Sequence, residues 1–193
     1  MLAVYTCPVL VRAAHEPSYE AFAALDRRIA AALEETPPAG LVRATRTLEA
    51  PARWPAHVGA VAGGTAKPTL SVWADLGSAF AYAYGPGPHR EALRRRRDWF
   101  ALVSQPIYVL WHVPCAAAAT HDAAVERLER LQREGPTPAA FDFRHPFDPN
   151  GRPLDPAGRG LPDGRSDAPD SPGDRQRQGQ RGPLPLPLRD HGR

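Results

Sequence analysis

The composition of the chain changes sharply at residue 148, and this change confines any folded core to the residues before it. Residues 148–193 hold nine prolines, eight glycines, eight arginines and seven aspartates, while five leucines are their only large apolar side chains. So little apolar surface does not offset the entropy that a chain loses on ordering. We therefore predict one domain over residues 1–147, a length that supports a single core, and a disordered tail over residues 148–193.

The tail contains one apolar stretch near its end. Residues 183–188 read Pro-Leu-Pro-Leu-Pro-Leu, a sequence that favours the extended polyproline II helix. Such a helix either docks on an aromatic groove of a protein or stays a stiff, unbound segment. The sequence leaves both alternatives open.

Ahead of the tail, patterns typical of strands and of helices alternate, with short connections between them. The predicted strands cover residues 2–11, 41–48, 69–73 and 107–113. The predicted helices cover residues 17–35, residues 88–103 and a segment from Thr120 to Gly135, and residues 49–67 are predicted as a loop. The order βαββαβ, with an extra C-terminal helix, predicts an α+β, ferredoxin-like fold with a four-stranded antiparallel sheet.

A sheet of this kind carries helices on one face, and its other face must also be covered. A second copy of the same sheet is the simplest cover, since the sequence contains no internal repeat that would supply one. We therefore expect a homodimer in which two sheets form a dimeric α/β barrel.

Charge and cysteine content exclude several classes of function. The net charge is +3 and the basic residues are scattered along the chain, so we expect no nucleic-acid partner. Cys7 and Cys115 have neither CxxC spacing nor a nearby histidine pair, so no metal site is expected. No apolar run reaches the roughly 20 residues that span a bilayer, and we expect a cytoplasmic protein that binds no membrane.

The segment 88–103 carries the residues best suited to chemistry. On a helical wheel, His89 and Arg96 fall in the middle of the side that holds Trp99. An imidazole and a guanidinium placed in this way can line one pocket between helix and sheet. The imidazole would serve as acid, base or haem ligand, and the guanidinium would hold a carboxylate or enolate oxygen. The alternative is structural, with His89 packed at the helix start and Arg96 bonded to a core carbonyl or carboxylate.

The strand predicted over residues 107–113 places Tyr108 and His112 on one face and Trp111 on the other. If the first face looks into a cavity covered by helices, both polar rings join His89 there. If it looks at a partner subunit, they form hydrogen bonds across an interface, and the sequence leaves this open. The remaining histidines, His57 and His121 among them, are predicted to lie at the surface.

Seven blocks of sequence, taken in order, resemble a single family. They are residues 70–76, Tyr84 followed by His89, and residues 95–100, 109–111, 113–114, 126–131 and 135–141. They resemble the bacterial family catalogued as domain of unknown function thirty-two ninety-one, which is grouped with the dimeric α/β barrels. This sequence departs from that family at His112, where the second tryptophan of a pair is usual.

The resemblance implies an activity, because the wider superfamily includes cofactor-independent antibiotic-biosynthesis monooxygenases. We therefore expect a monooxygenase-like enzyme that acts without a cofactor on a hydrophobic small molecule, aromatic or polyketide-like. In it, His89 takes a phenolic proton and Arg96 stabilises the enolate. The pocket residues expected around them are Trp73, Tyr84, Trp99, Tyr108, Trp111 and His112. The alternatives are a non-catalytic ligand-binding or stress-response module, and a protein that binds haem through His89.

Overall fold

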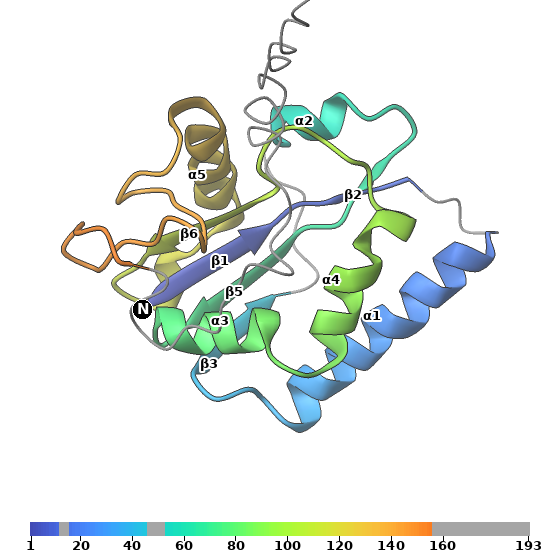
Figure 1. The fold of residues 1–193 in the computed structure, drawn as a ribbon, viewed down its shortest axis with the longest axis horizontal. Helices are drawn as coiled ribbons and strands as arrows, with labels where there is room; N and C mark the ends of the chain where they lie inside the picture. Colours follow the sequence, from blue (N-terminus) through green and yellow to red (C-terminus); the bar gives the residue numbers. More distant parts are fainter. Residues whose placement is uncertain (12–15, 46–52, 156–193) are drawn as a thin grey trace, which may run out of the picture.

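Four strands form one antiparallel sheet in a computed structural model, which describes residues 1–11, 16–45 and 53–155 (Figure 1). The strands are β1 (Leu2–Thr6), β3 (Leu41–Thr45), β5 (Thr69–Trp73) and β6 (Tyr108–His112). They lie side by side in the order β3-β5-β1-β6, and each neighbouring pair is antiparallel. Two short strands, β2 (Val9–Leu10) and β4 (Thr65–Ala66), form a separate ladder. The chain is thus of the α+β class.

The helices agree with the sequence patterns in part. They are α1 (Pro17–Glu35), α2 (Ala56–Gly59), α3 (Leu76–Tyr84), α4 (Pro88–Trp99) and α5 (His121–Glu134), with a 3₁₀ turn over Ala116–Ala118. Helix α1 and strand β5 have the predicted bounds, and the Thr120 hydroxyl caps α5 by accepting a hydrogen bond from the Ala123 N–H at 3.3 Å. Helix α3 was not predicted, and the prediction that residues 49–67 hold only a loop is wrong, because α2 and β4 lie within this range.

Two predicted elements end earlier than their patterns indicate. The strand predicted over residues 2–11 is interrupted at Pro8, because proline has no N–H to donate to a ladder. The helix predicted over residues 88–103 ends at Trp99, where the backbone becomes extended and pairs with strand β2. The Ala101 N–H donates to the Val9 carbonyl at 2.9 Å, and the Val11 N–H donates to the Trp99 carbonyl at 3.0 Å.

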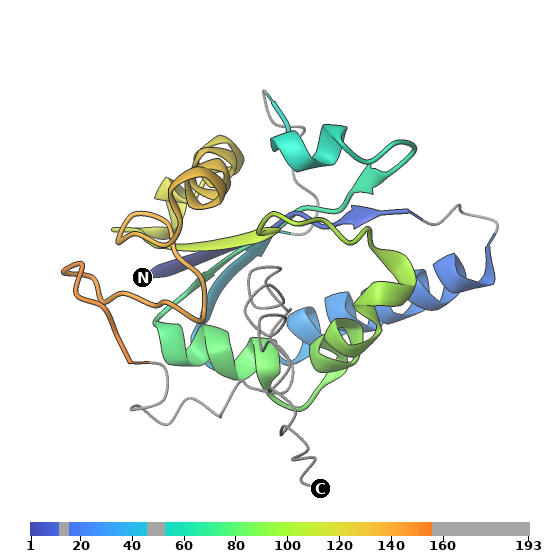
Figure 2. The same ribbon diagram turned by 45° about the horizontal axis from the view of Figure 1, so that its top comes forward.

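Helices cover both faces of the sheet, so the prediction of helices on one face is wrong. In Figure 2, α5 and α2 lie on one side of the sheet and α1, α3 and α4 lie on the other. On the first side, called the α5 face, Tyr5, Val72 and Trp111 pack against Leu128 and Leu131 of α5, and all five are at least 97% buried. The protomer therefore seals by itself the face on which the argument for a homodimer rested.

The other side, called the α3 face, has two separate clusters. Strand residues such as Leu2, Trp73 and Leu110 pack against Phe80 of α3 and against Phe141, which follows α5 in the chain. Helices α1 and α4 lie side by side (Figure 1) and form a cluster of their own. Its members include Phe22, Leu25, Ile29 and Trp99, and the rings of Phe22 and Trp99 are 5.6 Å apart.

The described chain continues eight residues beyond the predicted end of the domain. The Asp148 N–H donates to the Arg152 carbonyl at 2.9 Å, and the Leu154 N–H donates to the Pro146 carbonyl at 2.8 Å, so this segment folds back on itself. The rest of the predicted tail, from residue 156 on, lies outside the described residues.

Candidate functional site

His89 lies in the first turn of α4, where the backbone turns sharply out of α3. Gly87 has φ +145°, a conformation that favours glycine, and Pro88 follows as the first helical residue. The half-buried His89 ring then bonds through Nδ1 to the Ala83 carbonyl at 3.1 Å and packs against the tilted Tyr82 ring, with ring centroids 4.8 Å apart. The end of α3 therefore fixes the position of the imidazole.

The hydrogen bond to Ala83 determines which ring nitrogen of His89 can accept a proton. A carbonyl oxygen only accepts hydrogen bonds, so Nδ1 is the donor. In the neutral ring the lone pair must then lie on Nε2. This tautomer is suited to accept a hydrogen bond from an acidic O–H group.

A cavity of about 520 Å³, called the α1/α3 cavity, lies beside this imidazole. Its walls come from the end of α1, the turn after it, α3 and the start of α4. They include Ile29, Leu33, Pro38, Ser78, Tyr82 and His89. Most of these side chains are apolar, and the His89 ring and the Ser78 hydroxyl are among the few polar groups.

Gly40 allows two walls of this cavity to approach each other closely. It has φ +79°, and a Cβ atom at this position would lie 2.3 Å from Oγ of Ser78. Its carbonyl accepts the Ala74 N–H at 2.7 Å. A glycine is therefore required for the turn after α1 to rest on the first turn of α3.

Arg96 does not line the α1/α3 cavity with His89. Its Nη1 donates to the Leu93 carbonyl at 2.6 Å, within the same helix. Its charge acts on Tyr84: burial raises the pKa of this phenol, while the Tyr108 hydroxyl and the nearby cations lower it in part. The sequence predicted that His89 and Arg96 line one pocket, and no contact among the described residues brings the two side chains together.

Tyr84 and Tyr108 lie close together on the α3 face, and both are partly buried. Burial raises the pKa of Tyr108 well above its ordinary value, and the Tyr108 hydroxyl in turn lowers the pKa of Tyr84 in part. The Phe143 ring lies 5.5 Å from Tyr84 and 6.0 Å from Tyr108. Tyr108 therefore looks toward α3, which answers the question of the strand face that the sequence left open.

The three predicted tryptophans lie in three different places. Trp73 backs the cavity wall, since its ring is 5.1 Å from Tyr82 and its Nε1 donates to the Ser71 hydroxyl at 2.8 Å. Trp99 is fully buried between α1 and α4, and its Nε1 has no hydrogen-bond partner. Trp111 lies on the α5 face, away from His89.

His112 belongs to a second cavity of about 340 Å³, at the first turn of α3. Its Nε2 lies 2.8 Å from the Phe147 carbonyl and must donate to it. Other walls of this cavity come from Leu76, Gly77 and Asp155. Because Gly77 also lines the α1/α3 cavity, the two cavities share this turn.

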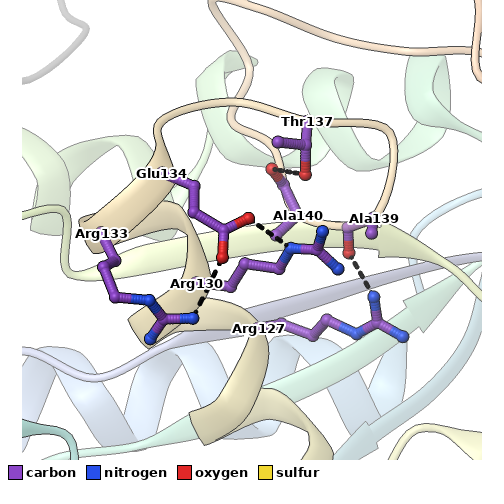
Figure 3. A network of polar contacts seen from close by, with 7 residues as sticks. All are labelled: Arg127, Arg130, Arg133, Glu134, Thr137, Ala139 and Ala140. Carbon is purple, nitrogen blue, oxygen red and sulfur yellow. Dashed lines mark hydrogen bonds and ion pairs between the residues drawn. The ribbon is translucent and has the colours of Figure 1, made fainter.

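The segment after α5 leads from the α5 face of the sheet to the α3 face, where Phe141 packs. Figure 3 shows how α5 holds it: Nη1 of Arg127 donates to the Ala139 carbonyl at 2.9 Å. Next to it, Arg130 and Arg133 both bind Glu134, at 2.8 and 3.1 Å, and these hydrogen bonds lower the pKa of that carboxyl. Phe141 then pairs with Leu110 through two backbone hydrogen bonds.

Sequence reasoning missed two residues of interest. Tyr82 contacts the His89 ring, and it lies in α3, which was not predicted. The signal available was Asp75, which caps α3 by accepting the Ser78 N–H at 2.7 Å. His57 was predicted at the surface but is only 3% exposed, so this prediction is wrong.

Neither a metal centre nor a membrane span emerges from the part of the chain that the structure describes. It contains no group of three or more histidine, cysteine, aspartate or glutamate residues placed to hold a metal ion. None of its helices combines the length and apolar character needed to cross a bilayer.

Comparison with known proteins gives a family. The model of the family described as Domain of unknown function (DUF3291) matches residues 1–155. The chain belongs to this family. The match confirms the resemblance seen in the sequence, and the DUF3291 domain runs to the last described residue. No curated protein and no solved structure matches the chain.

Proposed function

We propose that this DUF3291 protein binds a small apolar molecule that carries an acidic O–H group, in the α1/α3 cavity. The observation that carries the proposal is the position of His89, whose Nδ1 is bound to the Ala83 carbonyl, in the wall of a mostly apolar cavity. A phenol or naphthol fits this arrangement, because its ring fills an apolar space while its hydroxyl meets an acceptor.

The size and lining of the cavity support this class of ligand. Small-molecule sites in proteins commonly have about 300–1,000 Å³ and mostly apolar walls with a few placed polar groups. The α1/α3 cavity has about 520 Å³, with Ile29, Leu33 and Pro38 among its apolar walls. The Tyr82 ring adds an aromatic wall to the same space.

The proposal covers binding and proton acceptance by His89. A monooxygenase-like reaction also needs a cation near the enolate that forms, and Arg96 instead donates to the Leu93 carbonyl. The non-catalytic binding alternative therefore fits the geometry better than the enzyme does.

The test measures binding of 2-naphthol by fluorescence and compares it with 2-methoxynaphthalene, which has a similar shape but no O–H donor. We expect 2-naphthol to bind more tightly to the unmodified protein. His89→Ala should abolish this preference, a loss of about tenfold for a net hydrogen-bond energy near 1.4 kcal/mol. Ala32→Phe, which fills the cavity, should weaken both probes.

Arg94→Ala is the matched control, because Arg94 is an exposed residue of the same helix, and it should bind both probes normally. The proposal is wrong if 2-naphthol does not bind, or if neither His89→Ala nor Ala32→Phe changes its affinity. A Soret band in the purified protein that disappears in His89→Ala would favour haem as the ligand instead, since the same tautomer presents Nε2 to a metal.

We also infer that the fold is ferredoxin-like. The sheet order β3-β5-β1-β6 supports this topology, because βαββαβ units place their second, third, first and fourth strands in that order. On this view the ladder of β2 and β4, helix α2 and helix α5 are additions.

A further inference from the structure

The α1/α3 cavity is partly open to solvent, and its walls resemble a surface that binds proline-rich segments. Pro38, Pro86 and Pro88 line it together with the Tyr82 ring. Proline-rich segments dock in grooves lined by aromatic rings, because a polyproline II helix is already ordered before it binds.

The described part of the chain ends next to this cavity. Asp155 lines the second cavity with Leu76 and Gly77 of α3, and Gly77 also lines the α1/α3 cavity. The 27 residues from 156 to 182 separate this point from the proline and leucine segment. A random-coil chain of this length has an average end-to-end distance of about 30 Å. Helix α3, with its nine residues, is about 14 Å long. The cavity is therefore within reach of residues 183–188.

Those six residues are the part of 156–193 best suited to an apolar site. They are uncharged and hold Leu184, Leu186 and Leu188, while Leu161 is the only other large apolar residue after Asp155. In a helix with three residues per turn, each of the three edges of this segment carries one proline and one leucine. Whichever edge faces the cavity, the segment would therefore bury one proline and one leucine there.

Charges on the two sides are complementary. The segment is bounded by Arg181, two residues before it, and by Arg189 directly after it. Helix α1 ends in Glu34 and Glu35, which are exposed and lie between the cavity residues Leu33 and Thr36. An arginine at either end of a docked segment can pair with these carboxylates.

We propose that residues 183–188 of the same chain dock in the α1/α3 cavity and compete with its ligand. The inference concerns the regulation of that cavity and, in its ligand arm, rests on the proposed function. A ligand then meets a cavity that is open for only part of the time, and its apparent affinity falls by that fraction.

The test compares the full-length protein with a full-length variant that carries Leu184→Ser, Leu186→Ser and Leu188→Ser. Leu161→Ser is the matched control, because it removes a tail leucine outside the segment. Hydrogen exchange of the α3 amides should be slower in the unmodified protein and in the control than in the triple variant. A synthetic peptide of residues 182–189 should restore slow exchange when added to the triple variant.

In the ligand arm, the triple variant should bind 2-naphthol about tenfold more tightly if the segment fills the cavity nine times out of ten. Equal α3 exchange rates in all three proteins would overturn the proposal, as would an effect of Leu161→Ser as large as that of the triple variant. Protection that grows with protein concentration would also overturn it, because the segment would then come from a second copy. Failure of 2-naphthol to bind any form contradicts the proposed function, while the exchange arm still tests the docking.

Discussion

Buried phenols should limit the stability of this protein at high pH. Burial raises the pKa of Tyr108 and Tyr84 on the α3 face, and it also raises the pKa of Tyr5 on the α5 face. In the unfolded chain a tyrosine ionises near pH 10. Their contribution is therefore fully present below about pH 10 and is lost as the pH rises toward the higher folded values, because the unfolded state releases its protons first.

We expect the free energy of unfolding to fall steeply above about pH 10 and to fall less steeply in Tyr108→Phe, which has one fewer ionising group. Urea denaturation at a series of pH values from neutral to alkaline measures this. The comparison uses the slope of stability against pH and not its absolute level, since Tyr108→Phe also removes a hydroxyl that lowers the pKa of Tyr84. Identical slopes in the two proteins would contradict the expectation.

His57 shows which residue-level features the sequence could not predict. Its Nε2 donates to the Cys7 carbonyl at 2.8 Å, and the Gln132 amide donates to its Nδ1 at 3.1 Å and to the Pro106 carbonyl at 2.7 Å. Along the chain, Cys7 lies 50 residues from His57 and Gln132 lies 75 residues from it. No local pattern signals such pairing, whereas the inward side of α4 that holds His89 was visible from helical spacing.

At the scale of elements, the N-terminus of α3 controls the wall shared by the two cavities. Asp75 caps this helix through the Ser78 N–H. Asp75→Ala should reduce the free energy of unfolding by about 1 kcal/mol, the usual cost of losing such a cap, and Asp75→Ser should restore most of it. Thermal or urea denaturation measures both.

Asp98→Ala is the matched control for Asp75→Ala, since Asp98 is also an exposed acidic residue. Its described ion pair with Arg95, at 3.4 Å on the surface of α4, should contribute little to stability. Equal losses in the two alanine variants would show that the cap has no special role.

The elements that were predicted well have one apolar face and one charged or polar face. Helix α1 begins at a proline and repeats apolar residues at helical spacing between charged ones, so both its existence and its bounds were predictable. Helix α3 reads Leu-Gly-Ser-Ala-Phe-Ala-Tyr-Ala-Tyr and has no charged side at all. A helix without charged residues leaves no contrast between its faces for a periodic pattern to show. The end of α4 depends on a tertiary contact with strand β2.

At the scale of the whole molecule, the seal that α5 forms over the sheet can be tested directly. Leu128 is fully buried against the α5 face. Leu128→Ala should cost about 2–5 kcal/mol of stability, the range for such truncations in a core. Leu102→Ala, at a residue that is 81% exposed, should change stability little.

Sedimentation of the same two variants separates a sealed protomer from a sheet covered by a second copy. If α5 is the cover, the mass in solution should be the same for Leu128→Ala, Leu102→Ala and the unmodified protein under folding conditions. A change of mass in Leu128→Ala alone would indicate that this face takes part in association. If the mass is unchanged, a homodimer, as the family resemblance implies, has to use another surface.

The α+β class of the domain was predictable from the sequence, but the residue at which the domain ends was not. The change of composition at residue 148 is real, yet backbone hydrogen bonds such as that from Leu154 to Pro146 continue the described fold to residue 155. Such bonds need no apolar side chains, so hydropathy does not reveal them.

The helix pair α1 and α4 has a core of its own, distinct from the two cores that flank the sheet. The α1/α3 cavity takes one wall from this pair and another from α3, which packs with the sheet. Two contacts join these units: Nδ1 of His89 in α4 donates to the Ala83 carbonyl of α3 at 3.1 Å, and Gly40, after α1, lies against Ser78 of α3. These contacts set the width of the cavity, so a molecule thicker than the space between the units would have to break one of them.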